Sequence, residues 1–227
     1  MFFRFLAWVC LCLLESVHGQ GNEVQRHGLN FEHWVADAFF DGYRAPGPTE
    51  KWDIPASANK RHGNIPVNPK ATKYGEPVGL GDALRQYDID EPFLLVVGFW
   101  KQEGDTKHFV QSLTVRITPE TWRELWGGVT RADLEELDRL VKDTTRPVDE
   151  VRRAALLVKS KPPFSGAVIQ VNPKIDRSQR RLQCSISYAR LFASLAPDRD
   201  RGPVGTPEIF GRKIPSVKGS PRRSPSG

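Results

Sequence analysis

The stretch Phe93-Leu94-Leu95-Val96-Val97-Gly98-Phe99-Trp100 decides the fold class of this protein. It is apolar throughout and has the length of a strand rather than of a helix. An unbroken apolar run indicates a strand buried on both faces, as in the middle of a sheet covered by helices. Beyond a polar turn, residues 109–117 alternate between apolar and polar types, which predicts a neighbouring strand.

Helical patterns lie on both sides of this strand pair. Upstream, apolar residues recur at helical spacing and predict a helix over residues 29–41. Downstream, Thr118-Pro119 starts a helix with proline in its first turn, and Thr130 with Asp133 forms a capping box. The order favours an α/β or α+β fold in which helices flank a mixed sheet. The further predicted helices are 81–87, 119–126, 131–143 and 147–159, and a late strand pair is predicted at 167–171 and 182–188 across a charged turn at 174–181.

Composition and length point to one globular domain with two unusual ends. The chain has 227 residues, of which 39% are hydrophobic and 26% charged, which excludes wholesale disorder, collagen and a multi-span membrane protein. We assign residues 20–196 to the folded domain. Residues 197–227 are rich in Pro, Gly, Ser and Arg and carry most of the net charge of +6. We expect a disordered tail there, either solvated or acting as a basic arm for phosphates, because few apolar residues are present to bury.

Residues 1–19 allow two interpretations. A short apolar run lies between Arg4 and Gly19, which is the layout of a secretory signal peptide cleaved near Gly19. The run is too short to span a membrane, so we expect no membrane segment in the mature form. Alternatively, residues 1–19 are a mis-called N-terminal extension and translation begins further downstream. The cysteines do not decide between these two interpretations. Cys184 is the single cysteine outside this run, so no disulfide framework is implied.

Three charged residues stand where they could form one site. Glu32 lies on the first predicted helix, Asp53 on a short extended segment, and Lys70 at the end of the next one. A turn over residues 57–64 would pair these segments as a hairpin, and Asn68 would share a strand face with Lys70. Carboxylates bind Mg²⁺, which lowers the pKa of an attacking water and stabilises charge on a phosphate. A nearby lysine can orient that water, so the set suits phosphodiester hydrolysis.

With these residues the sequence resembles the PD-(D/E)xK nuclease superfamily, and within it the type II restriction endonucleases. The resemblance covers residues 25–117 and rests on Glu32, WDIP at 52–55, IPVNPKATK at 65–73, GDALRQY at 81–87 and the apolar strand. It implies a restriction-endonuclease-like mixed β-sheet flanked by helices, and Mg²⁺-dependent cleavage of double-stranded DNA. It also implies that Asp53 is the central metal ligand, Lys70 the catalytic lysine, and Glu32 a carboxylate that binds metal or orients water.

One position departs from the family pattern. Asn68 stands where the family has its second acid, and a neutral amide oxygen is a poorer ligand than a carboxylate. In some restriction enzymes the following helix supplies the missing acid, which makes Asp82 the first candidate here and Glu76 the alternative. Pro69 cannot donate to a strand ladder, so we expect an edge strand or a bulge. The expected metal ligands are Asp53, Glu32, Asn68 and Asp82.

Basic residues outside this set are candidates for DNA contact. Arginine forks on the late hairpin could contact phosphates or guanine edges, although a charged turn is often only solvated. This hairpin also holds residues 171–174, which repeat the tetrapeptide VNPK of residues 67–70 within otherwise different surroundings. The candidate DNA-binding residues are Lys73, Lys174, Arg177, Arg180 and Arg181.

We therefore expect an Mg²⁺-dependent, type II restriction-like endonuclease that cuts double-stranded DNA at a specific sequence. Restriction enzymes commonly act as homodimers, and a cytoplasmic location follows if residues 1–19 are not a signal peptide. The alternatives are a repair or junction nuclease of the same superfamily, and a non-catalytic DNA-binding module of the same fold, which Asn68 favours. A secreted binding protein is a third alternative, supported by residues 1–19 alone.

Overall fold

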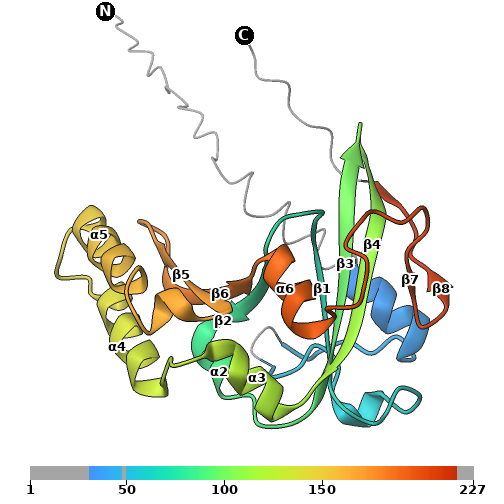
Figure 1. The fold of residues 1–227 in the computed structure, drawn as a ribbon, viewed down its shortest axis with the longest axis horizontal. Coiled ribbons are helices and arrows are strands. Elements are labelled where there is room, and N and C mark those ends of the chain that lie inside the picture. The colour runs from blue at the N-terminus through green and yellow to red at the C-terminus, as the bar shows by residue number, and fades with distance from the viewer. Residues whose placement is uncertain (1–30, 48–49, 219–227) are drawn as a thin grey trace, which may run out of the picture.

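The computed structural model describes residues 31–47 and 50–218 and has the mixed α/β architecture that the sequence predicts (Figure 1). The main strands are β1 (Val67–Lys73), β2 (Val78–Asp82), β3 (Phe93–Glu103), β4 (Thr106–Ile117), β5 (Ile169–Ile175), β6 (Arg180–Ile186) and β9 (Val217–Lys218). The larger sheet has the order β1-β3-β4-β9, with β1 and β3 parallel and the other pairs antiparallel. A second sheet, antiparallel throughout, has the order β2-β6-β5.

The helices cover these sheets and start largely where the sequence signals place them. Thr118 caps α3 through its hydroxyl, and both halves of the capping box of Thr130 and Asp133 are present before α4. One helix, α6, is not predicted, because the sequence pattern extends the preceding strand to residue 188, whereas Ser187 caps a new helix. The helices are residues 31–39, α2 (Ala83–Tyr87), α3 (Pro119–Trp126), α4 (Arg131–Lys142), α5 (Val148–Lys159) and α6 (Tyr188–Leu195), with 3-10 turns η1 (Ala56–Ala58) and η2 (Phe164–Gly166).

The apolar run forms the predicted central strand, since β1 and β4 pair with the two edges of β3. Its first seven residues are all buried. Leu95 and Val97 belong to a core shared with α3 to α6 and the second sheet, whereas Leu94 and Val96 belong to a core shared with the helix of residues 31–39. β3 is therefore the wall between two cores.

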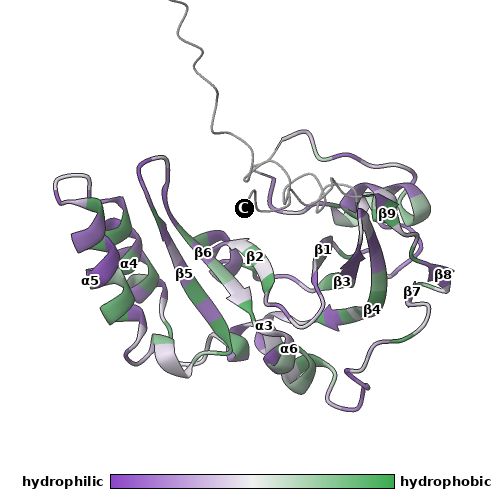
Figure 2. Ribbon diagram, turned by 90° about the horizontal axis from the view of Figure 1, so that it is seen from above, coloured by the Kyte–Doolittle hydropathy of each residue, from purple (hydrophilic) through white to green (hydrophobic). Residues whose placement is uncertain are grey.

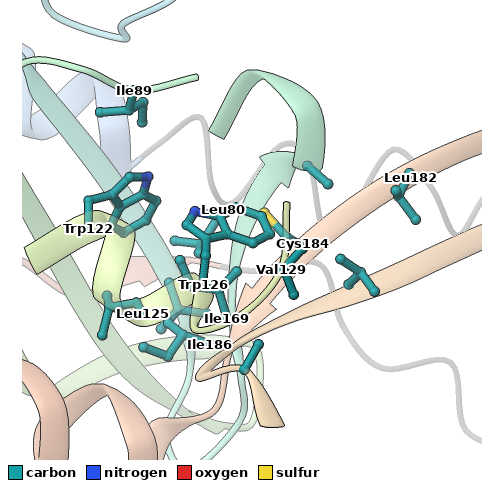
Figure 3. Close-up of a cluster of buried hydrophobic side chains, with 14 of the residues drawn as sticks. Leu80, Ile89, Trp122, Leu125, Trp126, Val129, Ile169, Leu182, Cys184 and Ile186 are labelled. Atoms are coloured by element: carbon teal, nitrogen blue, oxygen red, sulfur yellow. The ribbon is translucent and has the colours of Figure 1, made fainter. Parts of the chain in front are cut away.

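The first core holds most of the large apolar side chains. Figure 3 shows Trp122 and Trp126 of α3 among Leu80 of β2 and Ile169 of β5, with the buried thiol of Cys184 nearby. Burial and the charge of Asp82 raise the pKa of the Cys184 thiol well above its ordinary value. The thiol is thus a packing group of the core, as the alternation of the sequence around it indicates.

The second core fixes the first helix on the larger sheet. The rings of Phe31 and Phe109 stack 5.2 Å apart over Gly98 of β3. A Cβ atom at Gly98 would lie 2.6 Å from the Phe31 ring and 2.7 Å from the Phe109 ring, which is closer than such contacts allow. The missing side chain at Gly98 therefore determines how closely this helix approaches β3.

Residues 197–218 differ from the predicted disordered tail. They form short strands β7 (Glu208–Ile209) and β8 (Arg212–Lys213), and β9 extends the larger sheet. Side chains from the rest of the fold bind the backbone of this segment. Gln111 donates to the carbonyls of Asp200 and Gly202, and Tyr74 and Tyr188 both donate to the carbonyl of Arg201. Order here comes from hydrogen bonds with the body and a few buried anchors, which composition does not reveal.

The N-terminal interpretations for residues 1–19 lie outside the described residues, as do the last residues of the predicted tail, 219–227. Across the described ranges, no helix combines the length and apolar character needed to cross a membrane.

Substitution of Ile209 by alanine tests whether the C-terminal segment contributes to the core. Ile209 is 1% exposed, so we expect Ile209→Ala to lower the free energy of unfolding by about 2–4 kcal/mol through lost burial and a residual cavity. Urea denaturation of the full chain measures this. Val204→Ala, at a residue that is 39% exposed in the same segment, is the control and should change the stability by less than about 0.5 kcal/mol. Equal effects of the two substitutions would contradict the packing described here.

Candidate functional site

The segment that carries Asp53 pairs with the first residue of β1 across a loop of residues 55–66, so the hairpin that the sequence predicts is present. Ile54 and Val67 form an antiparallel bridge with backbone hydrogen bonds of 3.1 and 2.8 Å. The buried side chain of Asn59 fixes the loop between them, because its amide donates to the carbonyls of His62 and Ile65 and its oxygen accepts from the His62 N–H. The loop therefore holds Asp53 beside β1 in one geometry.

Trp52 anchors Asp53 from the other side. Its indole N–H donates to Glu91 at 2.9 Å, and its ring lies 5.0 Å from that of Phe93. Lys51 also pairs with Glu91, at 2.9 Å. The sequence analysis did not identify Asn59 or Glu91 as positioning residues, since neither stands in a motif and both act through contacts distant in sequence.

Asn68 and Lys70 lie two residues apart on β1 and therefore share one face of that strand. The bridge of Ile54 with Val67 brings the neighbouring Asp53 close to the same strand. The Lys70 Nζ donates to Asp53 Oδ2 at 2.7 Å, in an ion pair whose side chains are 18% and 39% exposed. The expected proximity of these two residues is thus present in the structure, in the form of an ion pair.

Glu32 completes the group from the helix of residues 31–39. Burial raises the pKa of Glu32, the positive charge of Lys70 opposes that shift, and the negative charge of Asp53 adds to it. Glu32 therefore lies within electrostatic range of both members of the ion pair. Among the described residues, Asp53 and Lys70 are in direct contact, and Glu32 interacts with both through its charge.

Asn68 is the unusual member of this face. Its side chain is 4% exposed, and its Oδ1 accepts no hydrogen bond from any described residue. A buried carbonyl oxygen without a donor is unfavourable and rare in folded proteins. Such an oxygen is suited to accept a cation or a water that the folded chain itself does not supply.

Asp82 has a different role in this structure. It lies at the end of β2, opposite Gln183 of β6, and its Oδ1 accepts the Arg85 N–H at 3.0 Å as the cap of α2. The alternative, Glu76, lies exposed in the turn between β1 and β2. Within residues 31–47 and 50–218, no three His, Cys, Asp or Glu side chains lie close enough together to form a metal-binding group. Of the expected metal ligands, Asp53 pairs with Lys70 and Glu32 interacts electrostatically with both, whereas Asn68 is placed by its position two residues before Lys70 on β1.

Of the predicted DNA-binding residues, Lys73 lies on β1 with Lys70, whereas the other four lie on the β5–β6 hairpin. Lys73 is exposed at the end of β1, and Arg177 is exposed in the β5–β6 turn. Lys174 and Arg181 face each other across that hairpin. Arg180 instead donates to the backbone carbonyls of Asp143 and Arg146, so its guanidinium is engaged in holding the hairpin against the α4–α5 loop.

Comparisons with protein-family models, with curated proteins and with solved structures give no match to this chain.

Replacement of Glu32 by glutamine should stabilise the folded protein near neutral pH. Because burial raises the pKa of Glu32 above its usual 4.5, its ionisation opposes folding as pH rises through that value, and the uncharged amide avoids this. We expect the melting temperature of Glu32→Gln to exceed that of the wild type by roughly 2–4 °C at pH 7–8, equivalent to about 1 kcal/mol.

Thermal unfolding in EDTA between pH 4 and pH 8 measures this difference. It should shrink toward zero below pH 4.5, where the carboxyl group is neutral in both the folded and unfolded states. The control is Glu124→Gln on the exposed side of α3. A variant less stable than the wild type at every pH would show that the Glu32 carboxylate is a structural partner instead.

Proposed function

We propose that this protein is an Mg²⁺-dependent endonuclease that hydrolyses phosphodiester bonds in double-stranded DNA, as restriction endonucleases of the PD-(D/E)xK type do. The observation that carries the proposal is the ion pair of Lys70 with Asp53 on an edge strand, within electrostatic range of the half-buried Glu32. Each member comes from a different segment, and the helix, hairpin and strand follow in the order of the family pattern.

The donor set fits a magnesium ion. Magnesium in proteins is usually held by one or two carboxylates and keeps several water ligands. Asp53 and Glu32 would supply the carboxylates, and the unpartnered Oδ1 of Asn68 would supply a neutral oxygen donor on the same strand face. When bound, such an ion would lower the pKa of an attacking water and stabilise negative charge on the phosphate.

The side chains of the chain itself account for the remaining parts of the reaction. The Lys70 ammonium is held in place by Asp53 and can donate a hydrogen bond to a phosphate oxygen or orient the attacking water. If Asp53 rather than Glu32 holds the ion, Glu32 is suited to accept a proton from that water, since burial raises its pKa. Among the described residues, β1 is the outermost strand of the larger sheet, and the edge away from β3 is bridged only at Ile54–Val67.

Sequence specificity and a homodimer are further parts of the proposal that rest on the family resemblance. Closed two-fold dimers are the common way to act on both strands of a palindromic duplex. A cytoplasmic location belongs to the same proposal, because a restriction enzyme acts on DNA inside the cell.

A second candidate is a non-catalytic DNA-binding module of the same fold. The observation that favours it is the role of Asp82, whose Oδ1 caps α2, while Asn68 stands at the position of the second acid. With one carboxylate fewer, the metal would be held more weakly. The two candidates differ in one measurable property, which is cleavage.

Cleavage of a long duplex of mixed sequence by the full chain tests the proposal. With Mg²⁺ we expect discrete fragments, and with EDTA intact DNA. We expect Lys70→Ala and Asp53→Asn to lower the single-turnover rate by about 10²–10⁴-fold, as expected when a positioned acid–base or metal-binding group is lost. Lys213→Ala, at an exposed lysine of β8, is the control.

The variants also separate the possible ligand sets. Asparagine caps helices as well as aspartate does, so Asp82→Asn should fold normally and retain cleavage if Asp53, Glu32 and Asn68 hold the ion. Loss of cleavage in a folded Asp82→Asn would move the ligand assignment to Asp82. Intact DNA in the presence of Mg²⁺, with folded wild-type protein that still binds duplex, would favour the non-catalytic module.

A further inference from the structure

One face of the β2-β6-β5 sheet is polar over most of its area. Residues buried in the first core alternate along β5 and β6 with residues that are partly or fully exposed. The strand register aligns these outward residues in three rows across the sheet. The rows are Gly79 with Ser185 and Gln170, Asp82 with Gln183 and Asn172, and Arg181 with Lys174.

Positive charge gathers at the free end of this face. Lys174 and Arg181 are exposed and directly opposite each other, and like charges in that position repel. Lys159 of α5 lies beside them, with its Nζ 3.5 Å from Asn172 Oδ1. Burial and the charge of Lys174 both lower the pKa of Lys159. In the part of the chain that the structure describes, none of these three cations has an acidic partner within ion-pair distance.

The amides behind these cations have unused hydrogen-bonding capacity. Asn172 is oriented, because its amide nitrogen donates to Ser185 Oγ at 2.8 Å. The side chains of Gln170 and Gln183 make no hydrogen bond with any described residue. The face therefore presents free donors and acceptors on a fixed backbone, next to uncompensated positive charge.

The hairpin is held rigidly from behind. β5 and β6 continue past the end of β2, whose pairing with β6 covers 183–186 only, so the cationic end is a two-stranded ribbon. Arg180 binds the α4–α5 loop, and Arg152 of α5 donates to the Ile175 carbonyl at 2.7 Å. Asp176 accepts hydrogen bonds from the backbone N–H groups of Ser178 and Gln179 and shapes the turn. Figure 2 shows this hydrophilic hairpin end projecting beside α5.

We infer that the outer face of the β5–β6 ribbon docks on the major groove of duplex DNA. The groove is about 12 Å wide and admits a two-stranded ribbon, and phosphates provide the negative charge that Lys159, Lys174 and Arg181 lack. In this arrangement Gln183, which lies farther from the tip of the hairpin, faces the base edges. Its side-chain amide can make the pair of hydrogen bonds by which glutamine recognises adenine. Asp82 stands beside Gln183 in the middle row, on β2 outside the two-stranded ribbon, and its Oδ1 accepts the Arg85 N–H as the cap of α2. This inference rests on the proposed duplex DNA substrate.

Binding without cleavage tests the inference separately from the nuclease proposal. The full chain is titrated in EDTA against a 30-base-pair duplex pool with a randomised centre, by fluorescence anisotropy at several salt concentrations. We expect the double variant Lys174→Ala/Arg181→Ala to bind roughly tenfold more weakly, with a salt slope smaller by about 2. The control removes the same charge from the exposed side of α4 and α5, as Arg139→Ala/Arg153→Ala.

Sequencing of the bound duplexes gives the second readout. Gln183→Ala should lose preference at one base position while keeping most of its affinity. Equal binding by both double variants would overturn the inference, as would stronger binding to a duplex RNA pool of the same sequences or no binding to duplex DNA at all. An unchanged base preference in Gln183→Ala would overturn the contact assigned to that residue.

The two proposals fail in different ways. If the wild type cleaves DNA while the ribbon variants bind and cut as it does, the inference fails and the nuclease proposal stands. If no preparation cleaves but the ribbon variants bind more weakly than the control variant, the docking surface stands and the catalytic proposal fails.

Discussion

The contact of the Phe31 ring with the backbone of β3 at Gly98 is the constraint on which the candidate site depends. Glycine at this position lets the Phe31 and Phe109 rings stack across the strand, and their contact seats the helix of residues 31–39. Glu32 is the next residue on that helix, so its distance from Lys70 and Asp53 is set by a packing contact of apolar groups. The chemistry of the site thus depends on a residue that has no side chain.

The candidate site contains buried polar groups that lower the stability of the fold. A half-buried Glu32 near Asp53 brings two acids together around a single lysine, and the neighbouring Asn68 oxygen is buried without a donor. Elsewhere the described core is mainly apolar, although Gln86 Oε1, Trp126 Nε1 and Arg131 Nη1 are also buried without a hydrogen-bond partner among the described residues. What distinguishes the candidate site is that its unpartnered oxygen lies on the same strand as the Lys70 that pairs with Asp53. Functional sites commonly include such groups, because stability is exchanged there for binding or catalysis.

Periodicity and capping signals were sufficient to predict the order of strands and helices from residue 93 to residue 159, because each signal is local. The approach of Asp53 to Lys70 was also predictable, since a hairpin loop connects the segments that carry them. α6 was missed because its cap, Ser187, continues the alternation of β6. Other features depend on partners distant in sequence. Glu91 accepts the hydrogen bond of Trp52, the neighbour of Asp53. The two VNPK tetrapeptides have different surroundings, because Lys70 pairs with Asp53 whereas Lys174 lies opposite Arg181.

The C-terminal segment is held mainly through its main chain. Gln111, Ser112, Tyr74 and Tyr188 all donate to carbonyl oxygens of residues 200–208, and any amino acid offers that acceptor. Only a few side chains, such as Ile209 and the Phe210 ring stacked 3.7 Å from His62, are needed by the body. The residues that order this segment are therefore mainly the side-chain donors on the rest of the fold. Most positions of the segment itself can change in sequence while its path over the sheet stays the same.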